Sequence, residues 1–144
     1  MRWLGGIAVV VDGKPVNAAE TLNFRGVMLS DVPNFANVFG YTNASWTLKS
    51  DLICAYISRL INYMDRHGYV ECTPRRDAAI KPQPLFDFTS GYIQRAIDQF
   101  PRQGSQQPWK LYQNYVRDLI SLRFGAVNDK ALEFARPRHS AEAA

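Results

Sequence analysis

The residues best suited to chemistry in this chain lie in a short polar turn between two apolar elements. Residues 42–47 follow the apolar run 35–41 and lead directly into a long amphipathic stretch. If that stretch is a helix, its first amides have no partner within it and carry the positive end of the helix dipole. Gly40, Ala44 and Ser45 are small enough for a ligand to approach the backbone closely. The turn therefore suits an anion or the electron-rich edge of a cofactor.

The elements on either side must position this turn. Apolar residues recur every three or four positions over residues 46–67, which predicts a helix with one buried face. Ser45 or Thr47 is suited to cap its start, and Gly68 follows as a C-terminal stop. A junction between a strand and a helix needs small capping residues even when no ligand binds. The composition of the turn therefore also fits a purely structural role.

Strand signals are concentrated in the first third of the chain. Asp12 and Gly13 lie between two apolar stretches, which predicts a hairpin that begins with a strand over residues 7–11. We expect a second strand over residues 22–29, broken by Gly26, and a third over residues 35–41. So few strands do not close a sheet. They are better explained as the last strands of a larger α/β sheet.

Helices are predicted to dominate the rest of the chain. Residues 71–88 contain three prolines and are expected to form an irregular connection. A short helix is predicted over residues 91–99 and a longer one over residues 109–123, with Pro108 at a favourable first position. Residues 132–134 are expected to add a short strand before a frayed tail.

Composition excludes several classes of protein. The net charge is +4, and the basic residues are scattered except for Arg75 and Arg76, so we expect no nucleic-acid partner. Cys54 and Cys72 are 18 positions apart without a neighbouring pair of histidines, so we expect reduced thiols in a cytoplasmic protein and no metal site. No run approaches the roughly 18 apolar residues of a membrane span, so no transmembrane segment is expected.

Six segments, taken together and in order, resemble one known group of enzymes. They are residues 25–34, 40–49, 60–65, 90–95, 101–105 and 108–115. The chain resembles the C-terminal fragment of a class B flavoprotein monooxygenase of the Baeyer–Villiger type, and most of all the ethionamide-activating monooxygenase group. The likeness extends from about Leu4 to Ala135, and it is specific as a set although each segment alone is a weak signal.

The resemblance implies a fold. It implies an α/β fragment made of the last strands of an FAD-binding Rossmann-like domain, followed by a mostly helical C-terminal extension. The implied divisions are residues 1–67 for the C-terminal part of the FAD-binding domain, 68–136 for the helical extension and 137–144 for a disordered tail.

The resemblance also implies a role for the turn. In such enzymes this helix start lies against the flavin, and its backbone amides hold the ring edge. The residues that would do so here are Asn43, Ala44, Ser45, Trp46 and Thr47. The Trp46 side chain would pack near the ring, or it would be an ordinary core aromatic.

The parts of the family that run its chemistry are absent from the sequence. The nine glycines form no Gly-x-Gly-x-x-Gly motif, of which the family uses one for FAD and one for NADPH, and the Baeyer–Villiger fingerprint is missing too. We therefore assign no catalytic residue. The resemblance implies a portion of an FAD- and NADPH-dependent monooxygenase, for Baeyer–Villiger oxidation or S-oxygenation, that is inactive and retains no cofactor when isolated.

The missing FAD and NADPH motifs also indicate which partners to expect. We expect a chain that carries the missing FAD and NADP domains, or self-association through unpaired apolar surface. The alternatives are one half of a split enzyme or a non-catalytic interaction module, whose helical stripes would bind another protein.

Overall fold

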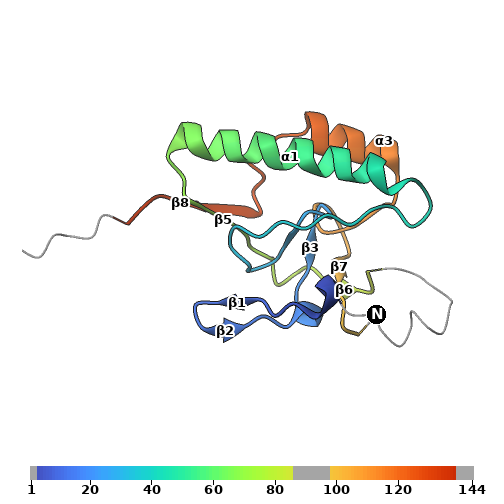
Figure 1. Cartoon of the computed structure of the whole chain (residues 1–144), viewed down its shortest axis with the longest axis horizontal. Helices are drawn as coiled ribbons and strands as arrows, with labels where there is room; N and C mark the ends of the chain where they lie inside the picture. The colour runs from blue at the N-terminus through green and yellow to red at the C-terminus, as the bar shows by residue number, and fades with distance from the viewer. Residues whose placement is uncertain (1–2, 86–97, 139–144) are drawn as a thin grey trace, which may run out of the picture.

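The computed structural model describes residues 3–85 and 98–138. A long helix, α1, lies across a layer of short antiparallel strand pairs, and a shorter helical stretch lies beside it (Figure 1). Every sheet in the described residues has two strands. The helix predicted over residues 91–99 falls, except for its last two positions, outside the described residues, as does most of the predicted tail.

The helix α1 spans Trp46–His67, as predicted. Gly68 ends it in the left-handed conformation with φ 67°, and its amide donates to the carbonyl oxygens of Asp65 and Met64. Glycine adopts this conformation without the steric penalty that a Cβ would bring. The face that packs on the hairpins carries the buried residues Lys49, Leu52, Ile53, Tyr56 and Leu60.

The hairpin predicted at Asp12 and Gly13 is confirmed. Strand β1 (Val10–Val11) pairs with β2 (Lys14–Pro15) in antiparallel register. Asp12 and Gly13 have φ values of 49° and 78°, as the tight two-residue turn requires. The first strand is shorter than the predicted range of residues 7–11.

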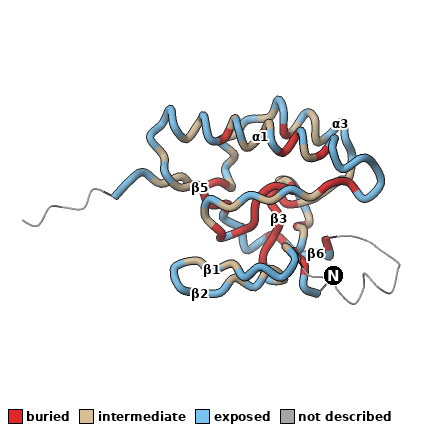
Figure 2. Tube along the Cα trace, viewed as in Figure 1, coloured by how far each residue is buried: buried red, intermediate tan, exposed pale blue. Residues whose placement is uncertain are grey.

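The expected strand over residues 22–29 is instead a second hairpin. Strand β3 (Asn23–Phe24) pairs with β4 (Met28–Leu29), and the chain reverses at Arg25 and Gly26, with φ values of 51° and 73°. The prediction was wrong because these positive values turn the chain back where one strand would have continued. This hairpin is almost completely buried and forms the centre of the core (Figure 2).

The strand predicted over residues 35–41 is also absent. The segment is extended, and its burial alternates along the chain, with Ala36 and Val38 exposed between half-buried neighbours. Its one backbone hydrogen bond to another element runs from the Asn37 amide to the Val27 carbonyl, at 2.8 Å. The prediction from the apolar run was wrong because a strand needs a ladder of hydrogen bonds to a neighbour, and this segment makes one such bond.

The connection predicted as irregular begins with a strand. Strand β5 (Glu71–Pro74) pairs with β8 (Leu132–Ala135), which confirms the short strand predicted over residues 132–134 and corrects the prediction for 71–74. Further on, β6 (Pro82–Gln83) pairs with β7 (Gln103–Gly104). Both pairings join residues far apart in the sequence, so no local turn signal announces them.

The helix predicted over residues 109–123 starts six positions late. It comprises α3 (Tyr115–Asp118) and a continuing π-helical stretch, η3 (Leu119–Phe124). Asn114 caps the start, because its side chain accepts a hydrogen bond from the Arg117 amide.

Burial of Trp109 explains the late start. Its side chain is 2% exposed and meets the ring of Phe24 edge-on, with the ring centroids 5.5 Å apart. A Cβ on Gly104 would lie 2.5 Å from the Trp109 Cβ, so the glycine is needed for this approach. Trp109 thus anchors residues 109–114 to the core as a loop. The helix that was predicted there does not form.

One hydrophobic core unites the two parts of the chain predicted as separate domains. A single buried cluster contains Phe24 and Tyr56 from the first part and Trp109 and Leu132 from the second. The described residues of 68–136 mix short strands with one helical stretch. The chain is therefore a small α/β unit, and the division at residue 67 stays a prediction.

Replacing Trp109 tests this packing. We expect Trp109→Ala to lower the free energy of unfolding by about 3–5 kcal/mol, since it leaves a large cavity in the core. Tyr112→Ala, three positions away and 38% exposed, is the matched control and should change it by less than about 1 kcal/mol. Urea unfolding followed by circular dichroism measures both. Equal losses would mean that Trp109 does not anchor the core.

Candidate functional site

The five residues predicted to meet a cofactor lie together at the exposed start of α1. Asn43, Ala44, Ser45, Trp46 and Thr47 are all exposed. Ser45 is the N-cap residue by backbone geometry, yet its side chain does not cap the helix. Its hydroxyl instead forms a hydrogen bond with the hydroxyl of Thr47, at 2.7 Å.

The charge at this helix start favours an anionic partner. The first turn of α1 contains no acidic residue, so no carboxylate neutralises the positive end of the dipole. The helix has 22 residues, its first residues are exposed, and the Ser45 side chain does not cap it. This is the arrangement that holds anions and electron-rich groups in other proteins.

Trp46 packs against the outside of the turn. Its ring is 54% exposed and lies 5.1 Å from the ring of Phe39, so it is not a core aromatic. A Cβ on Gly40 would lie 2.3 Å from the Trp46 ring, which makes glycine necessary for this contact. About half of the Trp46 side chain is thus open to solvent, and its contact with a cofactor stays a prediction.

Gln113, which lies about 70 residues further along the chain, forms hydrogen bonds with the turn. The Thr42 amide and hydroxyl donate to its side-chain oxygen at 3.1 and 3.3 Å. The Asn43 side-chain amide donates to the Gln113 backbone carbonyl at 3.3 Å. These contacts cross about 70 residues, and no motif around Gln113 pointed to them.

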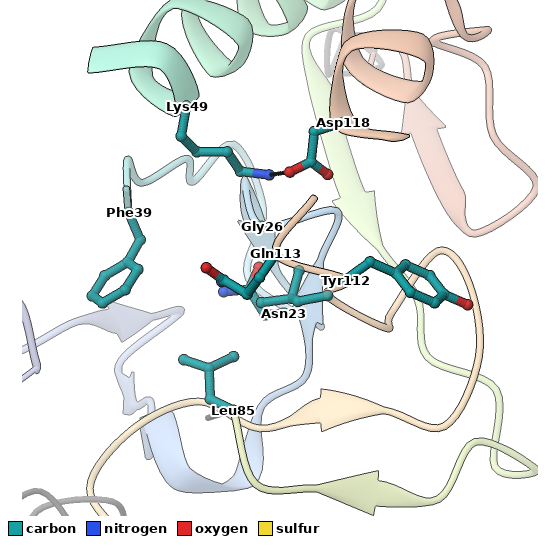
Figure 3. Close-up of a pocket in the computed structure, with 9 residues that line it drawn as sticks. Asn23, Gly26, Phe39, Lys49, Leu85, Tyr112, Gln113 and Asp118 are labelled. Atoms are coloured by element: carbon teal, nitrogen blue, oxygen red, sulfur yellow. Dashed lines mark hydrogen bonds and ion pairs between the residues drawn. The ribbon is translucent and has the colours of Figure 1, made fainter. Parts of the chain in front are cut away.

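A largely buried ion pair fixes the start of α1 to α3. The Lys49 ammonium lies 2.7 Å from the Asp118 carboxylate (Figure 3). The Tyr41 hydroxyl donates to the same carboxylate oxygen at 2.7 Å. We call these three residues the clamp. Tyr41 immediately precedes the turn, and Lys49 lies in the first turns of the helix, so the clamp secures both ends of residues 42–47.

Burial sets the protonation of the clamp. It lowers the pKa of Lys49, and the charge and hydrogen bond of Asp118 oppose that shift. Burial also raises the pKa of Tyr41, and the neighbouring Asp118 carboxylate raises it further. Tyr41 is therefore a neutral donor at physiological pH, held against a charged pair.

Lys49 and Asp118 also line a narrow recess, together with residues from the hairpin and the loop before α3 (Figure 3). Its cavity volume is about 20 Å³, which admits a water molecule but no ring system. Asn23 lines it, and its side-chain oxygen is buried without a hydrogen-bond partner. The recess therefore has no room for a cofactor ring.

The described residues offer little other chemistry. Cys54 is exposed and Cys72 is buried, and neither forms a disulfide. Burial raises the pKa of Cys72 to about 12, so it is a protonated thiol at neutral pH. Residues 3–85 and 98–138 contain no group of three or more His, Cys, Asp or Glu able to hold a metal ion. None of their helices is long and apolar enough to cross a membrane.

The clamp predicts a sharp difference between single and double substitutions. Asp118→Asn leaves the Lys49 charge buried and unpaired, so we expect a loss of about 3–5 kcal/mol in the free energy of unfolding. Adding Lys49→Met removes that charge and should restore most of the loss. Glu133→Gln breaks the exposed pair with Arg75 and should cost less than about 1 kcal/mol. A double variant as unstable as Asp118→Asn, measured by urea unfolding, would contradict this account.

Comparison with known proteins identifies the chain's relatives. It is 42% identical over 137 residues to the FAD-containing monooxygenase EthA of Mycobacterium tuberculosis, a match that covers 94% of this chain and 28% of that protein. It is 43% identical over 144 residues to EthA of Mycolicibacterium smegmatis, covering 99% and 29%. The probable FAD-binding monooxygenase AlmA of an Acinetobacter species is 46% identical over 136 residues, covering 93% and 27%.

The other two comparisons found nothing. No protein-family profile matches the chain, and no solved structure matches it. The chain spans between a quarter and a third of the length of the curated relatives it matches. Over almost its entire length, this chain is homologous to the C-terminal part of the FAD-containing monooxygenases.

Proposed function

We propose that this chain is the C-terminal portion of an FAD- and NADPH-dependent monooxygenase in which the start of α1 lies against the flavin ring. The carrying observation is the exposed, uncapped start of a 22-residue helix with no acidic residue in its first turn. When bound, FAD would supply the oxygen chemistry of Baeyer–Villiger oxidation or S-oxygenation, with NADPH as reductant.

The residues of the turn fit the flavin. The backbone amides of Asn43, Ala44, Ser45, Trp46 and Thr47 are candidates to donate hydrogen bonds to the electron-rich edge of the ring. A helix start stabilises a neighbouring negative charge by about 0.3–1 kcal/mol when exposed, and by up to about 2 kcal/mol when partly buried. Closing the site over the ring would therefore strengthen the interaction.

The clamp and Gln113 give the turn a fixed position. Lys49 and Asp118 hold the helix start, Tyr41 holds the preceding segment, and Gln113 holds Thr42 and Asn43. Because these donors are already held in place by the fold, little conformational entropy is lost when a ligand binds to them. That preorganisation is what a cofactor site on a short turn requires.

The remaining cofactor contacts would come from the rest of the longer enzyme. This sequence holds no glycine-rich motif for a pyrophosphate, so the turn would contact only the ring. The free thiols of Cys54 and Cys72 fit the cytoplasmic location that we propose.

An interaction module is the second candidate, and one surface favours it. Val116, Ile120 and Phe124 are 61%, 60% and 73% exposed and recur every four residues on α3 and η3. Such an apolar stripe is typical of a surface that binds protein. The same stripe would serve one half of a split enzyme.

The isolated chain should show no monooxygenase activity. Because the nucleotide-binding motifs are missing, we expect purified protein to be colourless and to leave NADPH unoxidised when a ketone or a sulfide is present. Absorbance near the flavin bands and at the NADPH band measures both. A yellow preparation that consumes NADPH only with substrate present would refute the proposal that the other cofactor contacts lie outside this chain.

A chimera tests the turn itself. In this chimera, the present chain takes the place of the matching 29% of the EthA relative of Mycolicibacterium smegmatis. The rest of that relative is kept, so one polypeptide contains both parts. Ser45→Asp places a carboxylate that caps the amides and repels the ring edge, so FAD affinity should fall by about tenfold.

Ser45→Asn is the matched control, because asparagine caps a helix equally well without charge. It should keep FAD affinity within about threefold, and neither variant should destabilise the isolated chain. FAD affinity is measured by fluorescence titration of the apo chimera. Equal affinities for the aspartate and asparagine variants would remove the turn from the flavin site.

A further inference from the structure

A second pocket lies well away from the start of α1. It is formed by the 3₁₀ helix η2 (Ala18–Glu20), the loop after β5 and the residues at the start of β6 and just before β7. Strands β6 and β7 lie on the side of the molecule away from α1 (Figure 1). The pocket volume is about 410 Å³, which is within the range of sites that hold small organic ligands. Two arginines, Arg76 and Arg102, line it.

The adjacent arginines Arg75 and Arg76 have different surroundings. The Arg75 guanidinium forms ion pairs with Asp31 and Glu133, at 3.2 and 3.0 Å. Arg76 forms no ion pair within residues 3–85 and 98–138, and its guanidinium donates one hydrogen bond, to the Glu20 backbone carbonyl at 3.3 Å. Because a guanidinium has five N–H donors, most donors of Arg76 have no partner in this part of the chain.

The backbone places Arg102 in the same pocket. Its amide donates to the Thr21 carbonyl at 2.9 Å, and its carbonyl accepts from the Asn23 amide at 2.8 Å. Its side-chain Nε donates to the Ala19 carbonyl at 3.2 Å, and it has no carboxylate partner among the described residues. The two arginines are therefore held on consecutive carbonyls of η2, and that structural role uses one N–H of each.

The charges of the lining favour an anion with several oxygens. The one acidic residue of the lining is Glu20, whose carboxylate accepts a hydrogen bond from the Asn17 side-chain amide at 3.0 Å. Two guanidiniums against one carboxylate leave a net positive charge. Guanidinium groups bind phosphate through parallel N–H donors, and a phosphate ester offers three strong acceptor oxygens that two arginines can share.

We propose that this pocket binds a phosphate group, and that the phosphate is carried by a small organic molecule of about nucleotide size. Arg76 and Arg102 donate hydrogen bonds to the phosphate oxygens. Leu22 and Pro82, which also line the pocket, provide apolar surface for the group attached to the phosphate. The site shares no residue with the turn at the start of α1, so this inference goes beyond the proposed function and does not rest on it.

Titration of the isolated chain tests the site without any flavin. Adenosine 5′-monophosphate and inorganic phosphate are the two probes, and the side-chain Nε–H signals of Arg76 and Arg102 in nitrogen-15 NMR report contact. Both probes should shift these signals to saturation, with a dissociation constant on the order of 1 mM or below. Sodium chloride and sodium acetate at the same ionic strength should not. A response to acetate or chloride equal to that of phosphate, or no saturable response, would overturn the proposal.

The same titration distinguishes the two sources of phosphate. If the attached group contacts Leu22 and Pro82, adenosine 5′-monophosphate should bind at least about fivefold more tightly than inorganic phosphate, and adenosine alone should not bind measurably. Equal affinities for the two phosphates would mean that the ligand is phosphate itself and would remove the organic part of the proposal. Adenosine binding as well as its monophosphate would overturn the phosphate site altogether.

Arginine variants test which side chains hold the phosphate. Arg76→Gln and Arg102→Gln should each weaken adenosine 5′-monophosphate binding at least about fivefold, because each removes a positive charge and its hydrogen bonds. Arg76→Lys keeps the charge and should lose less. Arg75→Gln is the matched control, since it makes the same charge change outside the lining, and it should stay within about twofold. Equal losses for Arg75→Gln and Arg76→Gln, with the fold checked by circular dichroism, would mean that net charge alone attracts the ligand.

The chimera with the Mycolicibacterium smegmatis relative shows whether the pocket stays open in the longer protein. Stripped of FAD and without NADPH, a folded chimera should bind adenosine 5′-monophosphate within about threefold of the isolated chain, and Arg102→Gln should again weaken that binding. Loss of binding in the chimera would mean that the rest of the protein covers the pocket, and the proposal would be wrong. FAD affinity of the same chimera reports separately on the proposed function.

Discussion

One carboxylate oxygen organises the functional end of this molecule. Asp118 accepts hydrogen bonds from both the Lys49 ammonium and the Tyr41 hydroxyl, each at 2.7 Å. Burying a charge costs free energy unless a partner and further hydrogen bonds compensate, and here one acceptor serves two donors. The end of the extended segment, the first turns of α1 and the end of α3 therefore meet at one point, and the exposed turn between them has a defined position.

The extended segment 35–41 lies between two surface features of the molecule. At one end it leads into residues 42–47, where the uncapped start of α1 is exposed. At the other end, Phe35 and Ala36 border an apolar groove of about 450 Å³ beneath the second half of the same helix.

Local signals predicted the parts of the fold that depend on neighbouring residues. The stripe and the stop at Gly68 defined α1, and Asp12 and Gly13 defined a hairpin. The hairpin at Arg25 was missed because a positive φ at arginine has no local signature. The late start of α3 follows from Trp109, whose burial against Phe24 is a tertiary contact.

The candidate site divides in the same way. Residues 43–47 are contiguous and were assigned from the family resemblance, at a helix start that the pattern of apolar residues predicted. Gln113 and Asp118 reach the site from α3 and the loop before it. No sequence pattern marked Lys49, which is only 5% exposed in the structure. Their roles depend on which segments the core brings together. The burial of Trp109 against Phe24 fixes the loop that carries Gln113.

The central claim is that the turn's amides contact the flavin ring, and an experimental structure of the FAD-bound chimera tests it most directly. The account predicts at least one backbone nitrogen of residues 43–47 within about 3.2 Å of a ring heteroatom, with the Trp46 indole alongside. A ring bound elsewhere, with these amides still open to solvent, would contradict it.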